Sequence, residues 1–315
     1  MSCGRAPDNG GVARPLKVGI QLPEVEREVR WPELREMAET AEAIGLDSIW
    51  LGEHLLYRSP DGAARGPWEA WSLLGALATA TKRVEIGPLV ACVGFHNPAV
   101  LAKTAATIDE ISGGRLIFGL GAGWNRTEFE AFGVPYDHRV SRFEDAFAII
   151  RGLLQDGRVD YRGRWHSAPD CELLPRPTRP SGPPLLIGST GARMLEIALP
   201  HVAAWNAWYR SFGNAVEGYR ALRTEIDDAC RSAGRDPAEV ARTVALLVRF
   251  PGGTGRRSGD PTPEPDPIPG DPDLLAPALR AFAAEGVSHV QLVLDPITVE
   301  SIAALEPTIR LLDAN

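Results

Sequence analysis

Short apolar segments rich in β-branched residues alternate with amphipathic segments along almost the whole chain. The apolar segments predict buried strands, and the amphipathic segments have the spacing of helices. We expect the strands at residues 17–22, 47–52, 83–93, 115–121, 183–189, 202–208, 242–250 and 289–295. We expect the helices at residues 31–45, 67–80, 97–112, 141–155, 192–199, 214–234, 273–286 and 299–313.

Strict alternation of eight strands with eight helices implies parallel strands joined by crossover helices. Eight parallel strands can close into a barrel without free edges, so we predict an α/β protein with the (β/α)8 or TIM-barrel fold. An open, doubly wound sheet is the alternative architecture. At 315 residues the chain suits one such domain over residues 16–315, preceded by a disordered extension at residues 1–15.

Two connections are longer than the others. Residues 158–183, after the fourth helix, and residues 251–272, after the seventh strand, are both rich in proline. Loops of this length in a compact barrel are usually lids or disordered segments. Because it follows a strand, the second loop is expected on the active face, as either a flexible loop or a lid.

The segment from His96 to Gly133 combines a helix, a strand and a glycine-rich turn. One apolar helix face is predicted from Val100, Leu101, Ala105, Ile108 and Ile111. Residues 112–114 (Ser-Gly-Gly) should end this helix, since glycine tolerates the left-handed geometry of a helix end. Gly119 and Gly121, at the end of the next strand, would let a flat or anionic group approach the backbone. Tight packing within the barrel is the alternative reason for these glycines.

Polar residues follow several of the predicted strands, where a barrel of this type forms its active site. Glu24 follows the first strand, Glu53 and His54 follow the second, and Asn125 follows the fourth. A histidine titrates near neutrality and can pass a proton, so its position at a strand end favours a catalytic over a structural role for His54. Glu53 is its neighbouring carboxylate.

The residues Gly188, Ser189, Thr190 and Gly191 form a turn that opens a helix directly after a strand. Free backbone N–H groups and the helix dipole make such a turn a candidate phosphate site. An ordinary helix cap by serine or threonine is the alternative interpretation. The G-x-G of residues 119–121 does not have the spacing of a dinucleotide-binding motif, so we do not expect a Rossmann site.

Large aromatic residues also lie near the predicted active face. We expect Trp50, Trp124 and Trp205, together with Glu24, to line a substrate pocket, although such side chains can simply fill the barrel mouth. The apolar side chains of the second helix predict a partner surface and hence a homodimer.

The net charge of −8 and a pI near 5.4 argue against a nucleic-acid or anionic-membrane surface. The four cysteines and six histidines have neither disulfide-framework nor metal-ligand spacing, so we expect no metal. No signal-peptide pattern or apolar run of about 18 residues is present. We therefore expect a cytoplasmic protein that acts on a small molecule.

Residues 111–125, ISGGRLIFGLGAGWN, resemble the signature of the luciferase-like oxidoreductases, and the resemblance extends over residues 16–312. These enzymes use flavin mononucleotide (FMN) or the deazaflavin coenzyme F420. The resemblance to the F420-dependent branch implies hydride transfer between bound F420 and a small organic substrate. It implies an acid/base role for His54 beside Glu53, where many deazaflavin members have aspartate.

The same resemblance implies further cofactor contacts. The strand-3 backbone would bend near Ala91 and Cys92, in some members through a non-proline cis peptide, to support the central ring. Gly119 and Gly121 would lie beside the ring, Asn125 would make a polar contact, and residues 188–191 would hold the phosphate. Two alternatives remain: an FMN-dependent monooxygenase that uses reduced flavin and oxygen, and a non-catalytic barrel that acts as a binding protein.

Overall fold

The computed structural model describes residues 14–59, 62–177, 179–256 and 263–314. The first 13 residues of the expected N-terminal extension therefore lie outside the described part of the chain. Arg14, which we also assigned to that extension, is instead joined to the domain: its guanidinium is 3.1 Å from Asp47 Oδ2 and 2.8 Å from Asp313 Oδ1. The chain thus belongs to the folded domain from at least this residue onward.

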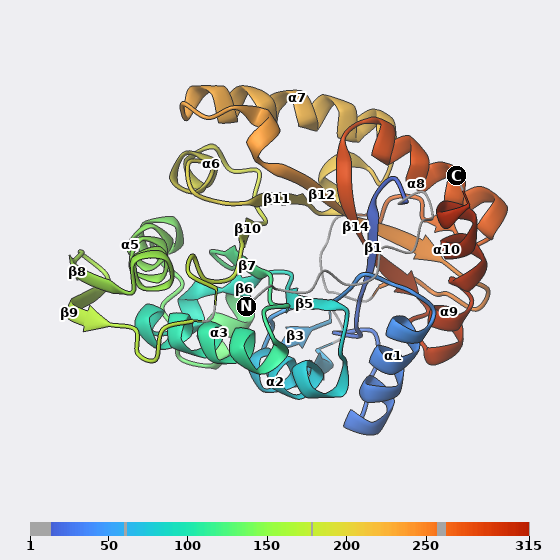
Figure 1. Cartoon of the computed structure of the whole chain (residues 1–315). Coiled ribbons are helices and arrows are strands. Elements are labelled where there is room, and N and C mark those ends of the chain that lie inside the picture. Colours follow the sequence, from blue (N-terminus) through green and yellow to red (C-terminus); the bar gives the residue numbers. More distant parts are fainter. Residues whose placement is uncertain (1–13, 60–61, 178, 257–262, 315) are drawn as a thin grey trace, which may run out of the picture.

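Parallel strands form a nearly closed barrel surrounded by helices, as predicted (Figure 1). The strands are β1 (Lys17–Gln21), β2 (Ser48–Leu51), β5 (Glu85–Pro88), β6 (Ala91–Cys92), β7 (Phe118–Gly121), β10 (Leu185–Ile187), β11 (Ala204–Ala207), β12 (Ala241–Arg249) and β14 (Val287–Asp295). Their order is β5-β2-β1-β14-β12-β11-β10-β7-β6. A parallel bridge joins Ile86 of β5 to Leu116, which lies just before β7, and β6 continues the chain from β5, so the series closes on itself and the open sheet is excluded.

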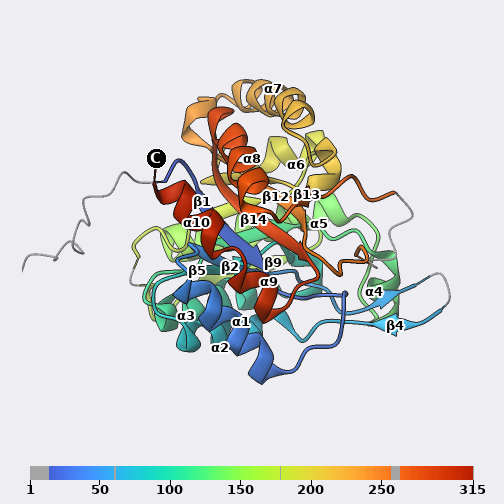
Figure 2. The same cartoon turned by 90° about the vertical axis from the view of Figure 1, so that its right-hand side faces the viewer.

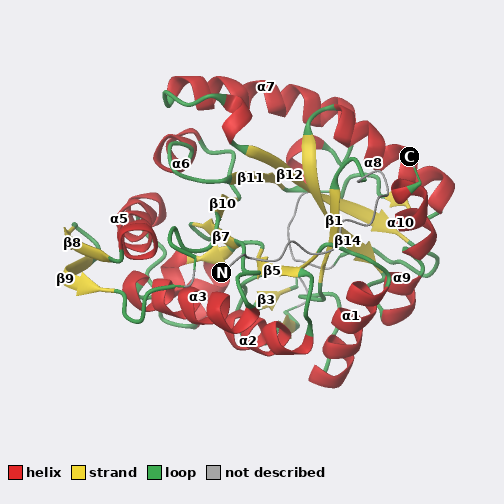
Figure 3. Ribbon diagram, in the orientation of Figure 1, coloured by secondary structure: helices red, strands yellow, loops and turns green. Residues whose placement is uncertain are grey.

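Each predicted helix is present and covers the outside of the barrel (Figure 3). The helices are α1 (Trp31–Ala43), α2 (Ala70–Ala80), α3 (Pro98–Ser112), α5 (Arg139–Arg151), α6 (Ala192–Ala198), α7 (Val216–Ser232) and α8 (Pro272–Ala284). The last one is divided into α9 (Val299–Ala303) and α10 (Glu306–Asp313). None of the described helices is both long enough and apolar enough to cross a membrane.

The ends of α3 show why the sequence forms a helix there. The Asn97 side chain accepts hydrogen bonds from the backbone N–H groups of residues 99 and 100, and Gly113 ends the helix with φ of 70°. The expected apolar face is only partly correct. Leu101, Ala105 and Ile108 are buried, but Val100 and Ile111 are exposed, because they lie on the side of α3 that faces away from the barrel.

The third expected strand is interrupted. β5 and β6 are separated by Leu89 and Val90, which are joined by a cis peptide bond that does not involve proline. The bend therefore lies just before Ala91 and Cys92, where we expected it. Val90 is left half-buried at the strand end, whereas Ala91 and Cys92 are buried.

Two short elements at the active face were not predicted (Figure 2). The connection after β2 contains an antiparallel pair, β3 (Tyr57–Arg58) and β4 (Ala64–Arg65). The glycine-rich end of β7 leads into α4 (Arg126–Ala131). Both elements are too short to give a clear hydrophobic period in the sequence.

The connection at residues 158–183 is not simply a long loop, as we had expected. It contains an antiparallel hairpin of β8 (Arg158–Arg162) and β9 (Ser167–Glu172), which lies beside α5 (Figure 1). Asp145 of α5 accepts hydrogen bonds from Tyr161 Oη at 2.8 Å and from Trp165 N at 2.6 Å, and this anchors the hairpin turn. β8 alternates exposed charged residues with the half-buried Val159 and Tyr161 over only five residues, and β9 is mostly exposed, so neither strand gives an apolar period long enough to predict it.

The described parts of the 251–272 connection lie against the barrel. The backbone N–H groups of Thr254 and Gly255 donate to Asp295, at 3.1 and 2.7 Å. β13 (Ile268–Pro269) pairs in parallel with the end of β12. Residues 257–262 lie outside the described residues, so whether this connection is a lid or a flexible loop stays a prediction.

Candidate active site

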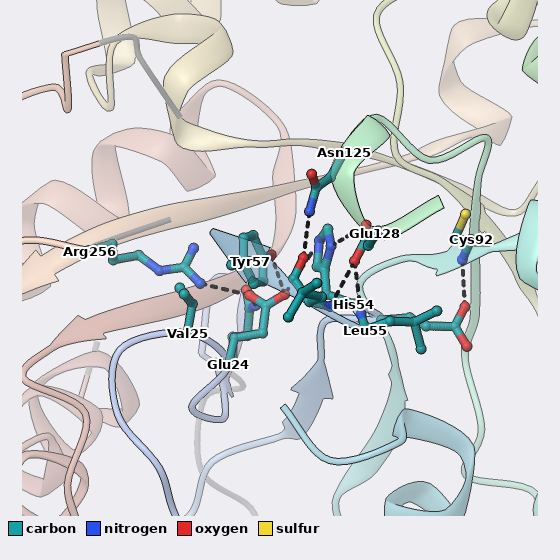
Figure 4. Close-up of polar contacts among 12 residues, drawn as sticks. Glu24, Val25, His54, Leu55, Tyr57, Cys92, Asn125, Glu128 and Arg256 are labelled. Atoms are coloured by element: carbon teal, nitrogen blue, oxygen red, sulfur yellow. Dashed lines mark hydrogen bonds and ion pairs between the residues drawn. The ribbon is translucent and has the colours of Figure 1, made fainter. Parts of the chain in front are cut away.

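His54, at the carboxyl end of β2, is held by a carboxylate from α4, the short helix that follows β7. Its Nδ1 lies 2.9 Å from Glu128 Oε1 (Figure 4). The other Glu128 oxygen accepts the backbone N–H of Leu55 at 2.8 Å. A carboxylate oxygen only accepts, so this contact places a proton on Nδ1 and orients Nε2. Glu128 is itself buried and fixes both the ring and the loop that carries it.

Glu24, at the end of β1, lies on the other side of the imidazole. Its Oε1 is 3.5 Å from His54 Nε2 and accepts a 3.2 Å hydrogen bond from Tyr57 Oη. Gln21 Nε2 donates to Glu24 Oε2 at 2.7 Å. Gly52 makes this arrangement possible, since a Cβ there would come within 2.0 Å of the Glu24 carboxylate. The histidine is thus placed between two carboxylates.

Arg256 brings the 251–272 connection into the same cluster. Its Nη2 is 2.7 Å from Glu24 Oε2, and its Nε pairs with Glu26. The guanidinium also lies over the Trp208 ring, 5.3 Å from the centroid. Only 5% of the Arg256 side chain is exposed, so this is a buried ion-pair network in which the charges depend on one another.

The surroundings of His54 favour its protonated form. Burial alone lowers the pKa of His54, but the hydrogen bond to Glu128 and the negative charge of Glu24 outweigh it, so the pKa is raised above its usual value. Burial and the charge of Glu24 raise the pKa of Tyr57 well above the usual range. Tyr57 therefore stays protonated as a hydrogen-bond donor, and His54 holds a proton more readily than a free imidazole does.

Glu53, which we predicted as catalytic with His54, faces a different set of partners. Its Oε2 accepts the Cys92 backbone N–H at 2.6 Å, and its Oε1 lies 2.7 Å from His96 Nε2. Both oxygens thus anchor the segment after β6. Cys92 is buried, and burial raises the pKa of its thiol, so a neutral packing role suits it. Glu128, rather than Glu53, is the carboxylate in contact with His54.

Three glycines surround Val90. A Cβ on Gly119 would lie 2.3 Å from the Pro88 carbonyl oxygen and 3.0 Å from Val90 Cγ1. A Cβ on Gly121 or on Gly188 would lie 2.7 or 3.0 Å from the Val90 side chain. These glycines thus make room for Val90, which forms an apolar platform at the adjoining ends of β6, β7 and β10. A flat ring would be supported by such a platform.

The turn at residues 188–191 is open to solvent. Thr190 and Gly191 are exposed, and the first turn of α6 has no side-chain cap. Ser189 Oγ accepts the Gly191 N–H at 3.2 Å, and Trp205 Nε1 donates to the Ser189 carbonyl at 2.7 Å. These two hydrogen bonds hold the conformation of the turn, and its outer side remains open to solvent, which suits an anion such as a phosphate.

The other predicted residues are distributed between core and surface. Trp50 and Trp205 are fully buried; Trp50 donates to Ser48 inside the barrel, at 2.7 Å. Neither of these two residues lines open space in this structure. Trp124 is half-exposed, with its ring centroid 5.7 Å from that of His54. Asn125 Nδ2 donates to the Leu56 carbonyl at 2.8 Å and ties α4 to the loop that carries His54.

Sequence reasoning missed several functional candidates. Glu128, Tyr57, Val90 and Glu26 all contribute to the site, and none was assigned to it. Glu128 and Tyr57 lie within segments that we had singled out, so their proximity in sequence to His54 and Asn125 was a usable signal. The pairing of Arg256 with Glu26 connects residues far apart in the chain, and no local pattern predicts it.

A parallel barrel that carries a half-buried histidine, an apolar platform and a solvent-exposed turn at its carboxyl face has the features that a cofactor-dependent enzyme would need. Residues 16–250 match the model of the luciferase-like monooxygenase family, and the chain belongs to this family. It is an enzyme, so we do not retain the interpretation as a non-catalytic barrel.

Individual relatives agree with this assignment. The chain is 31% identical to an F420-dependent glucose-6-phosphate dehydrogenase of Amycolatopsis mediterranei over 75% of this chain and 69% of the relative. It superimposes on an F420-dependent secondary alcohol dehydrogenase, solved with an F420–acetone adduct, with a TM-score of 0.78 at 20% identity over 95% and 99% of the chains. It also superimposes on the EDTA monooxygenase of Chelativorans sp. BNC1, with a TM-score of 0.76 at 15% identity over 96% and 94%. The two structural likenesses show the shared fold.

Proposed function

We propose that this enzyme transfers a hydride between bound coenzyme F420 and a small organic substrate such as an alcohol or a ketone. The observation that carries the proposal is His54, placed between Glu128 and Glu24 at the carboxyl face of the barrel. Removing a hydride from an alcohol also requires removal of the hydroxyl proton, and the reverse reaction requires its return. His54 Nε2 is the group that can exchange this proton.

The choice of F420 is supported by the sequence relative that uses this coenzyme, at 31% identity over most of the chain. The residues present also fit such a group. The Val90 platform would support the ring, and the exposed 188–191 turn would hold the phosphate. When bound, the deazaflavin would supply the hydride chemistry, and the protein would supply orientation and proton transfer.

The other residues would act through position. Glu128 fixes the His54 ring, and Tyr57 and Gln21 hold the Glu24 carboxylate. Trp124, half-exposed beside His54, would cover one side of the substrate. Arg256, which belongs to the 251–272 connection, covers the Glu24 side of the cluster and would help to exclude water from the cluster.

The first test is a fluorescence titration of the purified protein with F420 and, separately, with FMN. We expect saturable binding of F420 in preference to FMN. Ser189→Asp should weaken F420 binding about tenfold or more, because it adds a negative charge beside the phosphate. Ser189→Asn is the matched control, since it keeps a side-chain acceptor for the Gly191 N–H without the charge. Preference for FMN would favour the monooxygenase alternative, and binding of neither would contradict the proposal.

A second test addresses His54. With oxidised F420 bound, a panel of small alcohols should reduce the coenzyme, which is followed by the loss of its absorbance. His54→Asn should lower the rate about 100-fold or more while leaving F420 affinity within about threefold. Equal rates for the variant and the parent would remove His54 from the reaction.

We also propose that the chain is a homodimer. The original basis for this expectation is weakened, because Trp71, Leu74 and Leu77 of α2 are buried within the chain. A groove of about 660 Å³ between the beginnings of α2 and α3 nevertheless remains beside the exposed Val100. Sedimentation velocity of the parent and of Val100→Glu would test whether this face carries the contact.

A further inference from the structure

A cluster of arginine and aromatic side chains lies outside the site described above, around the beginning of α5. We call this cluster the arginine rim; its members are Tyr136, His138, Arg139, Arg142, Arg164 and Trp165. The guanidinium carbons of Arg142 and Arg164 lie 4.4 and 4.9 Å from the centroid of the Trp165 ring. A guanidinium over an aromatic ring is held in place and keeps its outward N–H groups for a ligand.

The β8–β9 hairpin carries part of this rim to the active face. Its base packs on the end of α5, where a Cβ on Gly152 would lie 3.1 Å from Val159. Its turn lies at the other end of the same helix, where Trp165 stacks on His138 with a centroid distance of 4.7 Å. The hairpin therefore runs back along α5 from the amino face of the barrel to the carboxyl face.

The rim adjoins the predicted cofactor site on two sides. Arg139 Nε donates to the Gly123 carbonyl at 3.0 Å, and Tyr136 Oη donates to the Trp124 carbonyl at 3.1 Å, which joins the rim to the end of β7. Glu144 of α5 and Arg193 of α6 form a 2.6 Å ion pair, which joins α5 to the helix that begins at the 188–191 turn.

The arginines of the rim do not form ion pairs with the part of the chain that the structure describes. Within the described residues, Arg139, Arg142 and Arg164 have no carboxylate partner. Arg142 Nε donates to the Asp137 carbonyl at 3.0 Å instead. Asp145, the nearest buried acid, is occupied by the hairpin turn. In a chain of net charge −8, three uncompensated guanidinium groups in one place form a local positive surface.

We propose that the arginine rim binds a flexible anionic chain bearing several carboxylates, namely the acidic tail of F420. This inference rests on the proposed function, which places the coenzyme phosphate at the neighbouring 188–191 turn. The planar fork of arginine matches a carboxylate, and several such pairs along a tail add their contributions. The rim thus determines affinity for long-tailed forms of the coenzyme, and it takes no part in the hydride transfer.

The test compares binding of a short-tailed and a long-tailed form of F420 by fluorescence titration at low and high salt. The parent protein should bind the long-tailed form about 3- to 10-fold more tightly at low salt, and salt should reduce this ratio. Arg142→Ala/Arg164→Ala should bring the ratio close to one while leaving affinity for the short-tailed form unchanged. Arg231→Ala/Arg310→Ala removes the same charge from α7 and α10 and should keep the parent ratio.

The outcomes separate the two proposals. If the parent binds neither form of F420, the proposed function fails and the inference fails with it. If the parent binds both forms equally, or if the Arg142/Arg164 variant keeps the parent ratio, the proposed function stands and the inference is overturned. Because a double alanine variant can lose structure, Arg142→Gln/Arg164→Gln, which keeps the first methylene groups and a polar end but removes the charge, is measured alongside it and should also bring the ratio close to one.

Discussion

On the β1–β2 side of the barrel mouth, charged side chains are buried and paired with one another, whereas on the β10–α5 side they are half-buried or exposed, and several have no carboxylate partner among the described residues. His54, Glu24, Glu26, Glu128 and Arg256 satisfy each other inside the protein. The 188–191 turn is open to solvent, and two arginines of the rim donate to backbone carbonyls rather than to carboxylates. In the functions proposed above, the first side would move a proton and the second would receive an anion from solution.

The largest difference between the two sides should be in the free energy of unfolding that is lost when one arginine is removed from each side. Arg256→Ala leaves Glu24 and Glu26 buried without their cation, which should lower the free energy of unfolding by about 3–5 kcal/mol. Arg193→Ala breaks an ion pair whose arginine side chain is 58% exposed and should cost less than about 1 kcal/mol. Urea denaturation of both variants measures this, and equal losses would contradict the comparison.

Two glycine-to-alanine substitutions, one at a buried and one at an exposed position, should also differ in their effect on stability. Gly119→Ala places a methyl group 2.3 Å from the Pro88 carbonyl oxygen and should destabilise the fold by about 1–3 kcal/mol. At Gly191 the nearest atom would be 3.7 Å away and φ is −70°, so Gly191→Ala should be neutral or stabilise by up to about 1 kcal/mol. Thermal melting distinguishes the two, and a stable Gly119→Ala variant would disprove the tight packing around Val90.

His54 and His96 are each paired with a different glutamate, so removing one glutamate charge should change the pKa of one histidine only. Glu128→Gln should lower the pKa of His54, since it removes the charged acceptor at Nδ1, and Glu53→Gln should lower the pKa of His96 instead. Titration of both imidazole rings by NMR measures the two shifts in each variant. If Glu53→Gln changed His54 as strongly as Glu128→Gln, the pairing seen here would not hold in solution.

The smallest effect is the pH dependence of stability. The pKa of His54 is raised in the folded state, so its contribution is fully present below the unfolded pKa near 6.5 and is lost as the pH rises through the folded pKa. Each pKa unit of difference corresponds to about 1.4 kcal/mol. Glu26 acts in the opposite sense, because its pKa is lowered and its contribution is lost as the pH falls. Urea midpoints of the parent and of His54→Asn between pH 6 and 9 isolate the histidine, and parallel curves would contradict this expectation.

The barrel itself could be predicted because its helices show a hydrophobic period and its strands, although several are short, lie in continuous apolar runs that alternate with those helices. Glycine at 113 and asparagine at 97 also marked the ends of α3 correctly. The β3–β4 and β8–β9 hairpins were missed for the opposite reason. Their strands are short or largely exposed, and partners such as Asp145 come from other elements.

The site could be predicted only where strand order dictates position. His54 and Glu24 were found because both follow strands that lie side by side in the barrel. The role of Glu53 could not be read correctly, since neighbouring residues at a strand end point to different sides. The sequence shows Glu53 beside His54, but only the folded chain shows that it reaches toward Cys92 and His96.

The β8–β9 hairpin, which runs along α5, can add side chains to the catalytic face without taking part in the closure of the barrel. Loops that follow strands shape the catalytic face and are constrained by the register of the sheet. This hairpin starts at the opposite end, contributes nothing to the closure of the barrel, and still delivers Arg164 and Trp165 to the catalytic face. If the arginine rim binds the coenzyme tail as proposed, the turn of this hairpin could be exchanged or shortened to change which tail lengths bind, while the barrel strands stay unchanged.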